Sequence, residues 1–293
     1  MGGKLIFQRV ARMTKLTVVR AKVDSYGAQK ENILIALDEN SEVLGSVCIY
    51  PFFAYDTEPE HPHNLYIHFR AERGQYLDEP VKDVLLENAL RRAAEVKSQA
   101  GQVKTRVYAC FFEYQKAEIA YFVSRGFIHD ESMYILEREN GREFPYLQAL
   151  EGITIKSWRM NAESEQKLFI ETHREIFPRH PYTPESLHKL KMLPGWNDYV
   201  AMSDTKIAGN IMVYFKDENN GIGYIEDLFV QAKWRRRGIA KNLVATALRY
   251  FQDAGINRVQ LEGWSANKAA MELYGEFDFK PIRETEIAVG RYV

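Results

Sequence analysis

An internal repeat constrains the fold of this chain more than any other feature of its sequence. At an offset of 152 residues, Lys116 superimposes on Lys268 and Phe127 on Phe279. Each of these segments follows a long amphipathic helix and then a strand, with helices predicted at 81–97 and 239–253 and strands at 105–112 and 258–261. Because the order of elements repeats, we predict two similar domains in tandem.

The length and composition agree with two globular domains. The chain has 293 residues, and a domain commonly holds roughly 150. Hydrophobic residues make up 46% of the chain and charged residues 27%, which excludes a disordered chain. The boundary is expected in or just after residues 140–145, so we predict domains at 1–145 and 146–293 without a long linker between them.

Hydrophobic periodicity predicts the elements of the second half. Strands are predicted at 152–158, 197–203, 206–215, 222–230, 257–263 and 279–292, and helices at 163–177, 183–192, 239–253 and 267–275. In the first half, only about a dozen residues separate the first two strands, at 16–21 and 33–37. That interval is too short for two helices, so we predict that the first domain lacks them.

Charge and hydropathy exclude several classes of partner. Lysine plus arginine number 39 and aspartate plus glutamate 40, so the net charge is -1 and no nucleic-acid partner is expected. No apolar run reaches the roughly 20 residues of a membrane span, and no secretion signal is evident, so we predict a cytoplasmic protein without a membrane partner. Cys48 and Cys110 are expected to be reduced, buried thiols. No histidine pair has metal-binding helical spacing, so no metal is predicted.

The segment after the strand at 222–230 has the pattern Arg-x-x-Gly-x-Ala and opens the helix at 239–253. The free amides of a helix's first turn, together with the helix dipole, form a site for a phosphate-like anion. Cations at that end oppose the dipole, so three successive arginines indicate an anionic partner. The segment matches neither a P-loop nor a dinucleotide-binding Gly-x-Gly-x-x-Gly. The predicted anion site consists of Arg235, Arg236, Arg237, Gly238, Ile239, Ala240 and Lys241.

Together with the pattern Asn-x-x-Ala-x-x-x-Tyr from Asn267 to Tyr274, this segment resembles the GNAT N-acetyltransferase superfamily over most of residues 150–293. The resemblance implies an α/β (α+β) fold with two GNAT-like domains. Each would be a mixed, mostly antiparallel central sheet flanked by helices, with central strands that splay apart to admit acetyl-CoA. It places the pyrophosphate on the arginine-rich segment, and the pantetheine and thioester on the amides of Leu228, Phe229 and Val230. Asp278 departs from the family's usual glycine, which alters a turn only.

Asn267 and Tyr274 lie seven residues apart and therefore on nearly one face of their helix. When an amine attacks a thioester, the leaving thiolate needs a proton, and a phenol in a partly apolar cleft can supply it. The resemblance assigns this acid to Tyr274 and a cofactor contact to Asn267. Two alternatives stay open, since Tyr274 can serve only to pack its ring and Asn267 only to cap its helix.

The attacking amine must also lose a proton, so a carboxylate beside the thioester is expected. Glu226 and Asp227 are adjacent in a predicted strand, and alternation predicts that they point to opposite faces. Their strand resembles that of diamine acetyltransferases, in which the matching glutamate is the proposed base. We therefore prefer Glu226, with Asp227, water alone and a purely structural glutamate as alternatives.

The first domain is predicted to be inactive. Phe122 stands at the position that corresponds to Tyr274, and it has no proton to donate. Gln115 replaces the asparagine, and Asp78 and Glu79 occupy the place of the anion site, where they repel a pyrophosphate. The tandem plan resembles that of mycothiol synthases, and we expect a structural or substrate-shaping role for this domain.

These patterns predict an acetyl-CoA-dependent N-acetyltransferase that acts on a primary amine of a small molecule by direct attack in a ternary complex. The segment 177–182 is expected to contact the acceptor. Two other interpretations stay open: an acyl-CoA-binding sensor without catalysis, and an aminoacyl transferase that uses charged tRNA. The neutral charge and the CoA-type segment disfavour the second. The sequence identifies neither the acceptor nor the oligomeric state.

Overall fold

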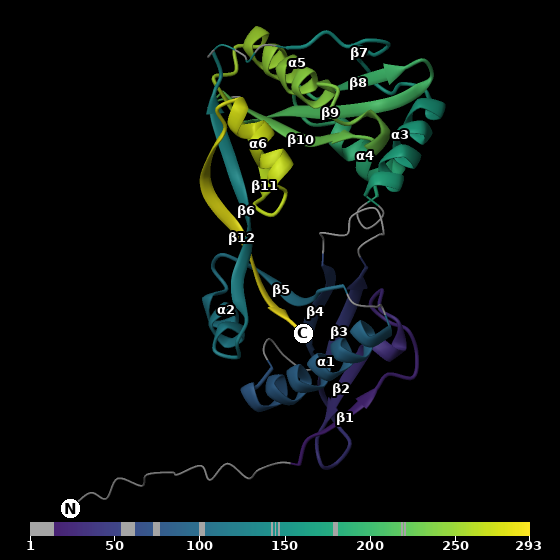
Figure 1. Ribbon diagram of the computed structural model, residues 1–293, viewed down its shortest axis with the longest axis vertical. Helices are drawn as coiled ribbons and strands as arrows, with labels where there is room; N and C mark the ends of the chain where they lie inside the picture. Colours follow the sequence, from purple (N-terminus) through teal and green to yellow (C-terminus); the bar gives the residue numbers. More distant parts are fainter. Residues whose placement is uncertain are drawn as a thin grey trace, which may run out of the picture. The chain divides into compact units, whose positions relative to one another are not determined.

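Strands and helices follow one another in the order that the repeat predicts (Figure 1). The structure, a computed structural model, describes residues 15–53, 62–72, 77–99, 103–141, 143, 145, 147–177, 181–217, 219 and 221–293. It divides into two compact units. Unit 1 consists of Met1–Asp130 and Ile287–Val293, and unit 2 consists of Glu131–Glu286.

The elements of unit 1 are β1 (Thr17–Arg20), the 3-10 helix η1 (Lys30–Asn32), β2 (Ile33–Leu37), β3 (Val43–Phe52), β4 (His63–Ala71), α1 (Glu79–Gln99), β5 (Thr105–Phe112) and α2 (Lys116–Val123). Strand β6 (Ile128–Glu139) begins in this unit and continues into unit 2. All residues between β1 and β2 are described, and they contain no helix other than η1. The predicted absence of two α-helices there is confirmed.

The elements of unit 2 are β7 (Thr154–Ser157), α3 (Glu163–Ile176), α4 (Pro184–Lys191), β8 (Asn197–Ser203), β9 (Lys206–Asp217), β10 (Ile222–Val230), the 3-10 helix η2 (Ala232–Trp234), α5 (Ile239–Asp253), β11 (Arg258–Trp264), α6 (Lys268–Glu276) and β12 (Lys280–Tyr292). These bounds agree with the predicted ones to within two residues. Local signals set several of them. At the start of α4, the Thr183 hydroxyl accepts a hydrogen bond from Ser186 N at 3.1 Å, and proline follows at the first helical position.

Each unit is built on a mixed sheet. In unit 2 the strand order is β12-β6-β11-β10-β9-β8-β7, and in unit 1 it is β1-β2-β3-β4-β5 followed by the end of β12. The pair β10–β11 is parallel, and so is the pair β4–β5. The registers of the other described pairs are antiparallel. The predicted mixed, mostly antiparallel sheet flanked by helices is confirmed.

The closing strands of the two halves are exchanged. In unit 2 the neighbour of β11 is β6, which comes from the first half of the chain, and Leu136 pairs with Leu261. In unit 1 the neighbour of β5 is β12, and Val293 N donates to Thr105 O at 3.0 Å. The units therefore change at residues 130 and 286, whereas the sequence predicted one boundary near residue 145. Pairing between strands, and not position along the chain, decides the unit to which a strand belongs.

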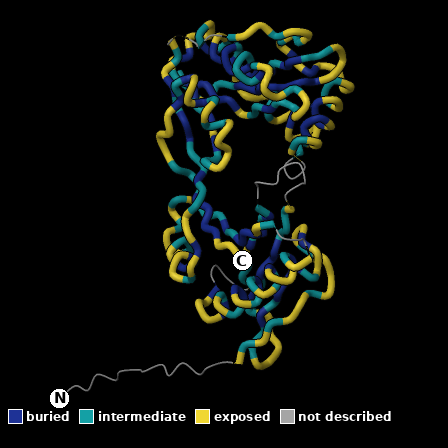
Figure 2. Tube along the Cα trace, viewed as in Figure 1, coloured by how far each residue is buried: buried dark blue, intermediate teal, exposed yellow. Residues whose placement is uncertain are grey.

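Alternating strand residues bury the two faces of the unit 2 sheet against different helices. Ile211 and Val213 belong to the cluster that contains Leu248 of α5, whereas Met212 between them belongs to the cluster that contains Phe169 of α3. The strands form the buried centre of each unit (Figure 2). In unit 1 one large cluster lies among the sheet, α1 and α2.

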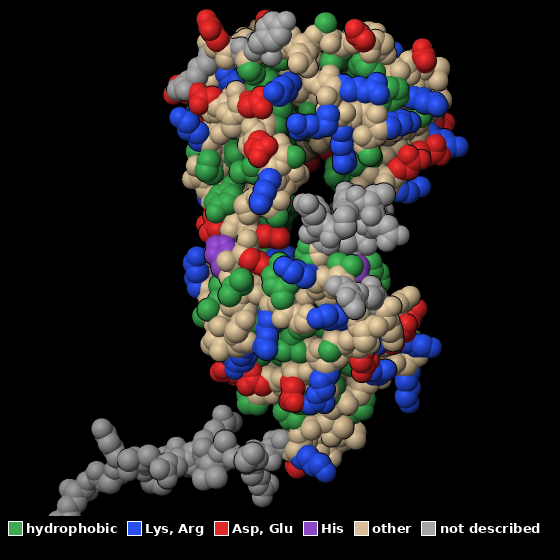
Figure 3. Space-filling model, viewed as in Figure 1, with side chains coloured by type: hydrophobic (Ala, Val, Ile, Leu, Met, Phe, Trp, Pro, Cys, Tyr) green, Lys and Arg blue, Asp and Glu red, His purple; other side chains and the backbone are tan. Residues whose placement is uncertain are grey.

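The surface in Figure 3 carries lysine and arginine side chains interspersed with carboxylates, as a net charge of -1 implies. In the part of the chain that the structure describes, no helix is long and apolar enough to cross a membrane. No group of three or more His, Cys, Asp or Glu side chains in that part is placed to hold a metal ion. Both cysteines are free thiols, with Cys48 buried and Cys110 half-buried.

Candidate active site

Among the described residues, no side chain caps the backbone amides at the start of α5. Gly238 is the N-cap residue, and its φ of 81° is a left-handed conformation that favours glycine. Arg236 precedes it with a φ of 63°. Ile239 is buried in the core cluster and Ala240 is half-buried. The first turn of α5 is therefore held against the core. The helix ladder begins with Asn242 N donating to the N-cap carbonyl at 3.1 Å, so the amides before it are available to an anion.

The predicted cations surround this helix start, and three of them contact other groups of the protein. Arg235 Nε donates to the last backbone carbonyl of β10 at 3.1 Å. The Arg237 guanidinium lies 5.2 Å from the centroid of the Trp234 ring. Lys241 forms an ion pair with Glu276 and is thereby tied to α6. All three arginines of the segment are exposed, so the segment keeps a positive surface next to the free amides.

Strands β10 and β11 diverge beside this helix start. Their parallel pairing joins Ile222–Ile225 to Arg258–Leu261 and ends there. From that point to its end, β10 pairs with β9 alone among the described strands. Phe229 is buried, and Leu228 and Val230 are half-buried. The divergence leaves one edge of this part of β10 without a ladder partner, as the predicted splay requires.

Tyr274 lies on α6 with 8% of its surface exposed. Its ring packs edge-on against Phe279, with 6.1 Å between the centroids. Burial, followed by the Asp227 carboxylate, raises the pKa of Tyr274 to about 12. The phenol is therefore protonated at neutral pH and able to donate to a developing anion. The influence of Asp227 also places the phenol within electrostatic reach of β10.

Asn267 caps α6. Its Oδ1 accepts a hydrogen bond from Ala270 N at 3.2 Å, which satisfies one of the free amides of that helix start. The structure therefore shows the capping role that the sequence had left open. The predicted cofactor contact of Asn267 stays a prediction.

The two candidate bases do not alternate as predicted. The register between β10 and β9 skips Glu226 between Ile225 and Asp227, which is a β-bulge. After burial, the carboxylates of Asp227 and then Glu226 raise the pKa of the Tyr182 phenol. Glu226 is exposed, yet partial burial and then the carboxylates of Asp227 and Glu262 raise its pKa.

His173 of α3 pairs with Asp227, and the sequence had suggested it only as one of several histidines without metal-binding spacing. Its Nε2 lies 3.1 Å from Asp227 Oδ2, and the two side chains are 6% and 12% exposed. The rings of Phe177 and Tyr182 lie with their centroids 4.8 and 4.6 Å from that of the imidazole. These two residues end the segment predicted to contact the acceptor; residues 178–180 between them lie outside the described residues.

Helical periodicity was the signal that could have found His173. Helix α3 buries Phe169, Ile170 and His173, so the histidine continues the apolar stripe at i+3 and i+4 spacing. A titratable side chain on the core-facing stripe of a helix requires a buried partner. Nothing local, however, identifies that partner as a carboxylate on β10.

A second buried carboxyl lies in the same row of the sheet. Asp198 is fully buried and accepts hydrogen bonds from Asn210 Nδ2 at 2.6 and 2.7 Å. Asp198 and Asp227 are both cross-strand partners of Met212, so their side chains lie on one face. Burial raises the pKa of Asp198 well above its ordinary value. Nothing in the sequence indicated that Asp198 and Asp227 lie on one face beside Met212, because the three residues come from three different strands.

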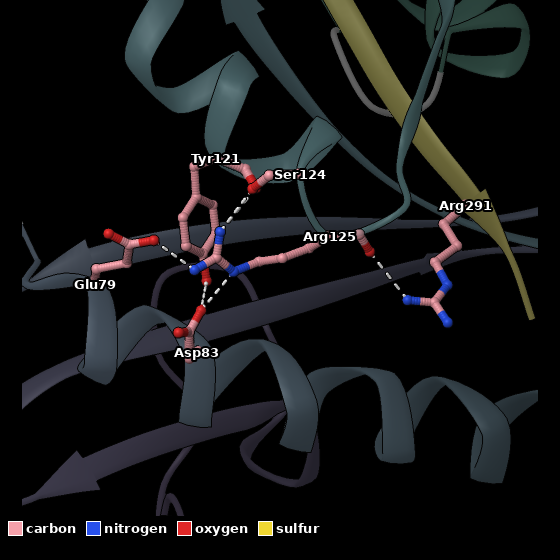
Figure 4. Close-up of polar contacts among 6 residues, drawn as sticks. All are labelled: Glu79, Asp83, Tyr121, Ser124, Arg125 and Arg291. Atoms are coloured by element: carbon pink, nitrogen blue, oxygen red, sulfur yellow. Dashed lines mark hydrogen bonds and ion pairs between the residues drawn. The ribbon is translucent and has the colours of Figure 1, made fainter.

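In unit 1 an arginine of the chain itself contacts acidic side chains near the start of the corresponding helix (Figure 4). The Arg125 guanidinium contacts Glu79 at 2.7 Å and Asp83 at 2.5 Å, and it lies 3.7 Å from the centroid of the Tyr121 ring. The Tyr121 hydroxyl donates to Asp83 at 3.0 Å. The start of α1 thus presents carboxylates with their own cation, the reverse of the arrangement at α5.

The counterpart of Tyr274 in unit 1 belongs to an aromatic cluster. Phe122 is 2% exposed, and its ring lies 5.7 Å from that of Phe69 on β4 and 5.4 Å from that of Phe111 on β5. The parallel pairing of β4 and β5 covers only their first four residue pairs, so these strands diverge too. Apolar rings from both strands meet Phe122 beyond that point.

Comparison with known proteins relates this geometry to a family. Residues 163–279 match the family model described as acetyltransferase (GNAT) family. A stretch of 82 residues, 28% of this chain, is 35% identical to N-alpha-acetyltransferase MAK3 of Arabidopsis thaliana and covers 43% of it. A stretch of 94 residues, 31% of the chain, is 43% identical to N-acetyltransferase 8 of Homo sapiens and covers 41% of it. The chain spans less than half the length of these curated relatives.

Among solved structures, a probable N-acyltransferase from Enterococcus faecalis V583 is similar over most of the chain. The TM-score is 0.52 at 14% identity, and the match covers 88% of this chain and 61% of that one. At such an identity the likeness concerns the fold alone. The family match is more specific, because it contains the diverging strands, the uncapped start of α5 and Tyr274. The part of this chain that is similar to the acetyltransferase (GNAT) family is therefore residues 163–279.

Proposed function

We propose that this chain is an N-acetyltransferase that uses acetyl-CoA and acts on a primary amine of a small molecule. The observation that carries the proposal is the uncapped start of α5 beside the point where β10 and β11 diverge. A phosphate bound to the first turn of α5 lies next to a strand edge with free backbone groups. A long ligand with a pyrophosphate at one end can use both features at once, and acetyl-CoA has that form.

The chain's own groups fit this co-substrate. Amides at the start of α5 bind the pyrophosphate, and the exposed arginines beside them add attraction. Gly238 lacks a side chain, and Ala240 has only a methyl group, so the backbone is accessible to a bulky anion. By resemblance to the family, the amides of Leu228, Phe229 and Val230 contact the pantetheine and the thioester.

Three groups carry out the proposed transfer. Glu226, directly or through one water, takes a proton from the ammonium group of the acceptor, and the neutral amine attacks the thioester carbon. The amides of β10 stabilise the negative charge on the carbonyl oxygen. As the C–S bond breaks, Tyr274 donates a proton to the thiolate. The second proton of the acceptor nitrogen leaves through solvent and restores the phenol.

Glu226 is the preferred base for two reasons. Its side chain is exposed, so an amine can reach it, and its raised pKa brings it closer to neutral pH, where a general base works best. Asp227 is mostly buried and paired with His173, and we assign these two a positioning role beneath the reacting groups.

We also propose that the first domain, at residues 1–145, binds no acetyl-CoA and that residues 146–293 hold the catalytic machinery. Two features of unit 1 support this division. Arg125 fills the helix start that would hold the pyrophosphate, and Phe122 has no proton to donate. An anion at α1 would have to displace Arg125 and face two carboxylates.

Release of free CoA tests the proposed function. The full chain is incubated with acetyl-CoA and, in turn, with polyamines, aminoglycosides, amino acids and short peptides, and free thiol is measured. We expect release with at least one amine. Calorimetric binding of acetyl-CoA without release across the panel would favour the non-catalytic sensor, and neither binding nor release would overturn the proposal.

A further inference from the structure

One face of the unit 1 sheet has no α-helix packed on it in the described part of the chain. In unit 2, residues of α5 and α6 bury one face of the sheet, and residues of α3 and α4 bury the other. In unit 1, α1 and α2 both contribute to the single large cluster, which contains Val47 of β3 and Ile67 of β4. The opposite face, which we call the open face, carries only a small cluster of Ala28, Ile33 and Cys48. The absence of two helices between β1 and β2 therefore leaves the open face without a helical cover.

Alternation along β3 and β4 brings three polar side chains together on the open face. Ser46 is the cross-strand partner of Arg70, and Cys48 is that of His68. Since Cys48 belongs to the small cluster, the side chains of Ser46, His68 and Arg70 lie on the same face as it does. Ser46 and Arg70 are half-buried, and His68 is exposed. A hydroxyl, an imidazole and a guanidinium are therefore neighbours on adjacent strands.

The charge of Arg70 has no carboxylate partner among the described residues, because none of their ion pairs includes it. Its guanidinium lies 4.0 Å from the centroid of the Tyr26 ring, and its Nε is buried without a hydrogen-bond partner in the described part of the chain. Arg106 of β5, on the same face, differs: it is 2% exposed and donates to both carboxylate oxygens of Asp130, at 2.7 and 2.5 Å. Buried polar atoms are seldom left unpaired, so Arg70 indicates an anion from outside the described chain.

The side chains around Arg70 are neutral at neutral pH. Partial burial and then the Arg70 charge lower the pKa of His68, so its imidazole is uncharged. Its Nδ1 lies 3.4 Å from the Tyr66 hydroxyl, and with Nδ1 accepting from that phenol, Nε2 carries the proton and can donate. Burial raises the pKa of the Cys48 thiol and of the Tyr50 phenol, so both keep their protons. Among these five side chains, Arg70 alone is charged.

We propose that the open face of unit 1 binds a small oxyanion, a carboxylate or a phosphate group, on the guanidinium of Arg70. Two oxygens of such a group fit the planar fork of donors that arginine presents. The Ser46 hydroxyl and the His68 imidazole, on the same face, donate further hydrogen bonds. This site goes beyond the proposed acetyl transfer, and it gives a ligand-binding role to the unit in which we propose no catalysis.

NMR titration of the histidine side chains in the full chain tests this site. A bound anion offsets the Arg70 charge, so phosphate or acetate should raise the measured pKa of His68 by about half a unit, compared with sodium chloride at the same ionic strength. His188, exposed on α4 of unit 2, is the control and should not respond beyond the effect of salt. A response to phosphate alone identifies a phosphate site, and a response to acetate alone a carboxylate site. No rise at His68 with either anion, or an equal rise at His188, would overturn the inference.

A charge-matched pair of variants locates the anion at Arg70. Arg70→Gln removes a charge that lowers the pKa of His68, so this pKa should rise without any added anion and should not rise further with phosphate or acetate. Arg91→Gln removes the same charge from α1, where Arg91 forms an exposed ion pair with Glu87, and should leave both values as in the unchanged chain. A response to the anions that persists in Arg70→Gln would contradict the site.

Ser46→Ala keeps the guanidinium and its contact with Tyr26, so it tests the site even where Arg70→Gln fails to fold. We expect the pKa of His68 without anion to be unchanged, and the Kd of the anion from the same titration to rise about 3- to 10-fold, since one hydrogen bond is lost. An unchanged Kd would contradict the site as described. None of these measurements involves acetyl-CoA, so their failure would leave the proposed acetyl transfer intact.

Discussion

At the scale of residues, the phenol of Tyr274 is the most direct test of the proposed acid. Tyr274→Phe removes the hydroxyl and keeps the ring that packs on Phe279. We expect calorimetry to give an unchanged affinity for acetyl-CoA, while kcat falls roughly 10- to 1000-fold, since a thiolate is a fair leaving group even without help. Tyr250→Phe is the control, because its hydroxyl bonds to Gly195 O, away from β10. An intact kcat in Tyr274→Phe would leave Tyr274 with a packing role only.

The proposed base makes a separate prediction about stability. Burial, and then Asp227 and Glu262, raise the pKa of Glu226 in the folded chain. A carboxyl whose pKa is higher in the folded than in the unfolded state destabilises the fold above both pKa values and has no such effect below the unfolded value, about 4.3. Glu226→Gln should therefore raise Tm at neutral pH and leave it unchanged near pH 3.5, measured by thermal unfolding. A lower Tm at neutral pH would contradict the raised pKa.

The sequence located some of these residues and could not locate others. Tyr274, Gly238 and the arginines stand in local patterns that can be read along the chain, and the roles proposed for them come from the resemblance of those patterns to a family. The bulge at Glu226 interrupts the regular pairing of β10 with β9, and nothing in the alternation of the sequence announces it. His173 meets Asp227 only after α3 has packed on the sheet, and no local pattern contains that contact.

At the scale of elements, the start of α5 decides where acetyl-CoA binds. Gly238→Glu places bulk and negative charge at the proposed pyrophosphate site, so acetyl-CoA binding should be lost in calorimetry. Gly255→Glu is a matched control at the other end of the same helix. Its φ is 72°, against 81° at Gly238, and an added Cβ meets nothing within 4 Å. Both variants carry a backbone cost of about 1 kcal/mol, but only the first should lose binding. Unchanged affinity in Gly238→Glu would place acetyl-CoA elsewhere.

The bounds of elements were predictable, and the partners of strands were not. The strand 222–230 and the helix 239–253 have their predicted ends, because buried residues run through each, and the chain turns at Gly221 before the strand and at Gly238 and Gly255 on the two sides of the helix. The patterns of β6 and β12 also predict strands. Alternation, however, shows only which face of a strand is buried, and it does not show which strand lies next to it. The exchange of these two strands therefore had no signal in the sequence, and the predicted boundary at 145 missed it.

At the scale of the whole molecule, the two units should differ in what they bind. Since Arg125 fills the helix start of unit 1 and α5 in unit 2 has free amides, we expect one acetyl-CoA per chain. Isothermal titration measures this stoichiometry directly. Gly238→Glu is the control, because it should abolish the one site. Two equivalent sites would contradict the assignment, since an anion would then bind beside Glu79 and Asp83.

The exchanged strand β6 predicts which fragments of the chain can fold. A fragment of residues 146–293, the domain expected from the sequence, lacks β6, so β11 keeps β10 but loses its other neighbour, and the core loses Leu136. Loss of one buried leucine side chain costs about 2–5 kcal/mol by itself, and Arg138, which bonds to Phe277 O at 2.9 Å, is lost as well. A fragment of residues 131–286 keeps these contacts.

We therefore expect fragment 131–286 to unfold cooperatively and to bind acetyl-CoA, and fragment 146–293 to be poorly soluble or to show no cooperative transition. Thermal unfolding and calorimetry on both fragments measure the difference. Fragment 131–286 also ends before the part of β12 that pairs with β5 in the full chain. In a fragment without β5, that part of β12 would have an exposed edge. Equal stability of the two fragments would mean that β6 is dispensable for unit 2, and that the boundary near residue 145 describes the folding unit better than the strand pairing does.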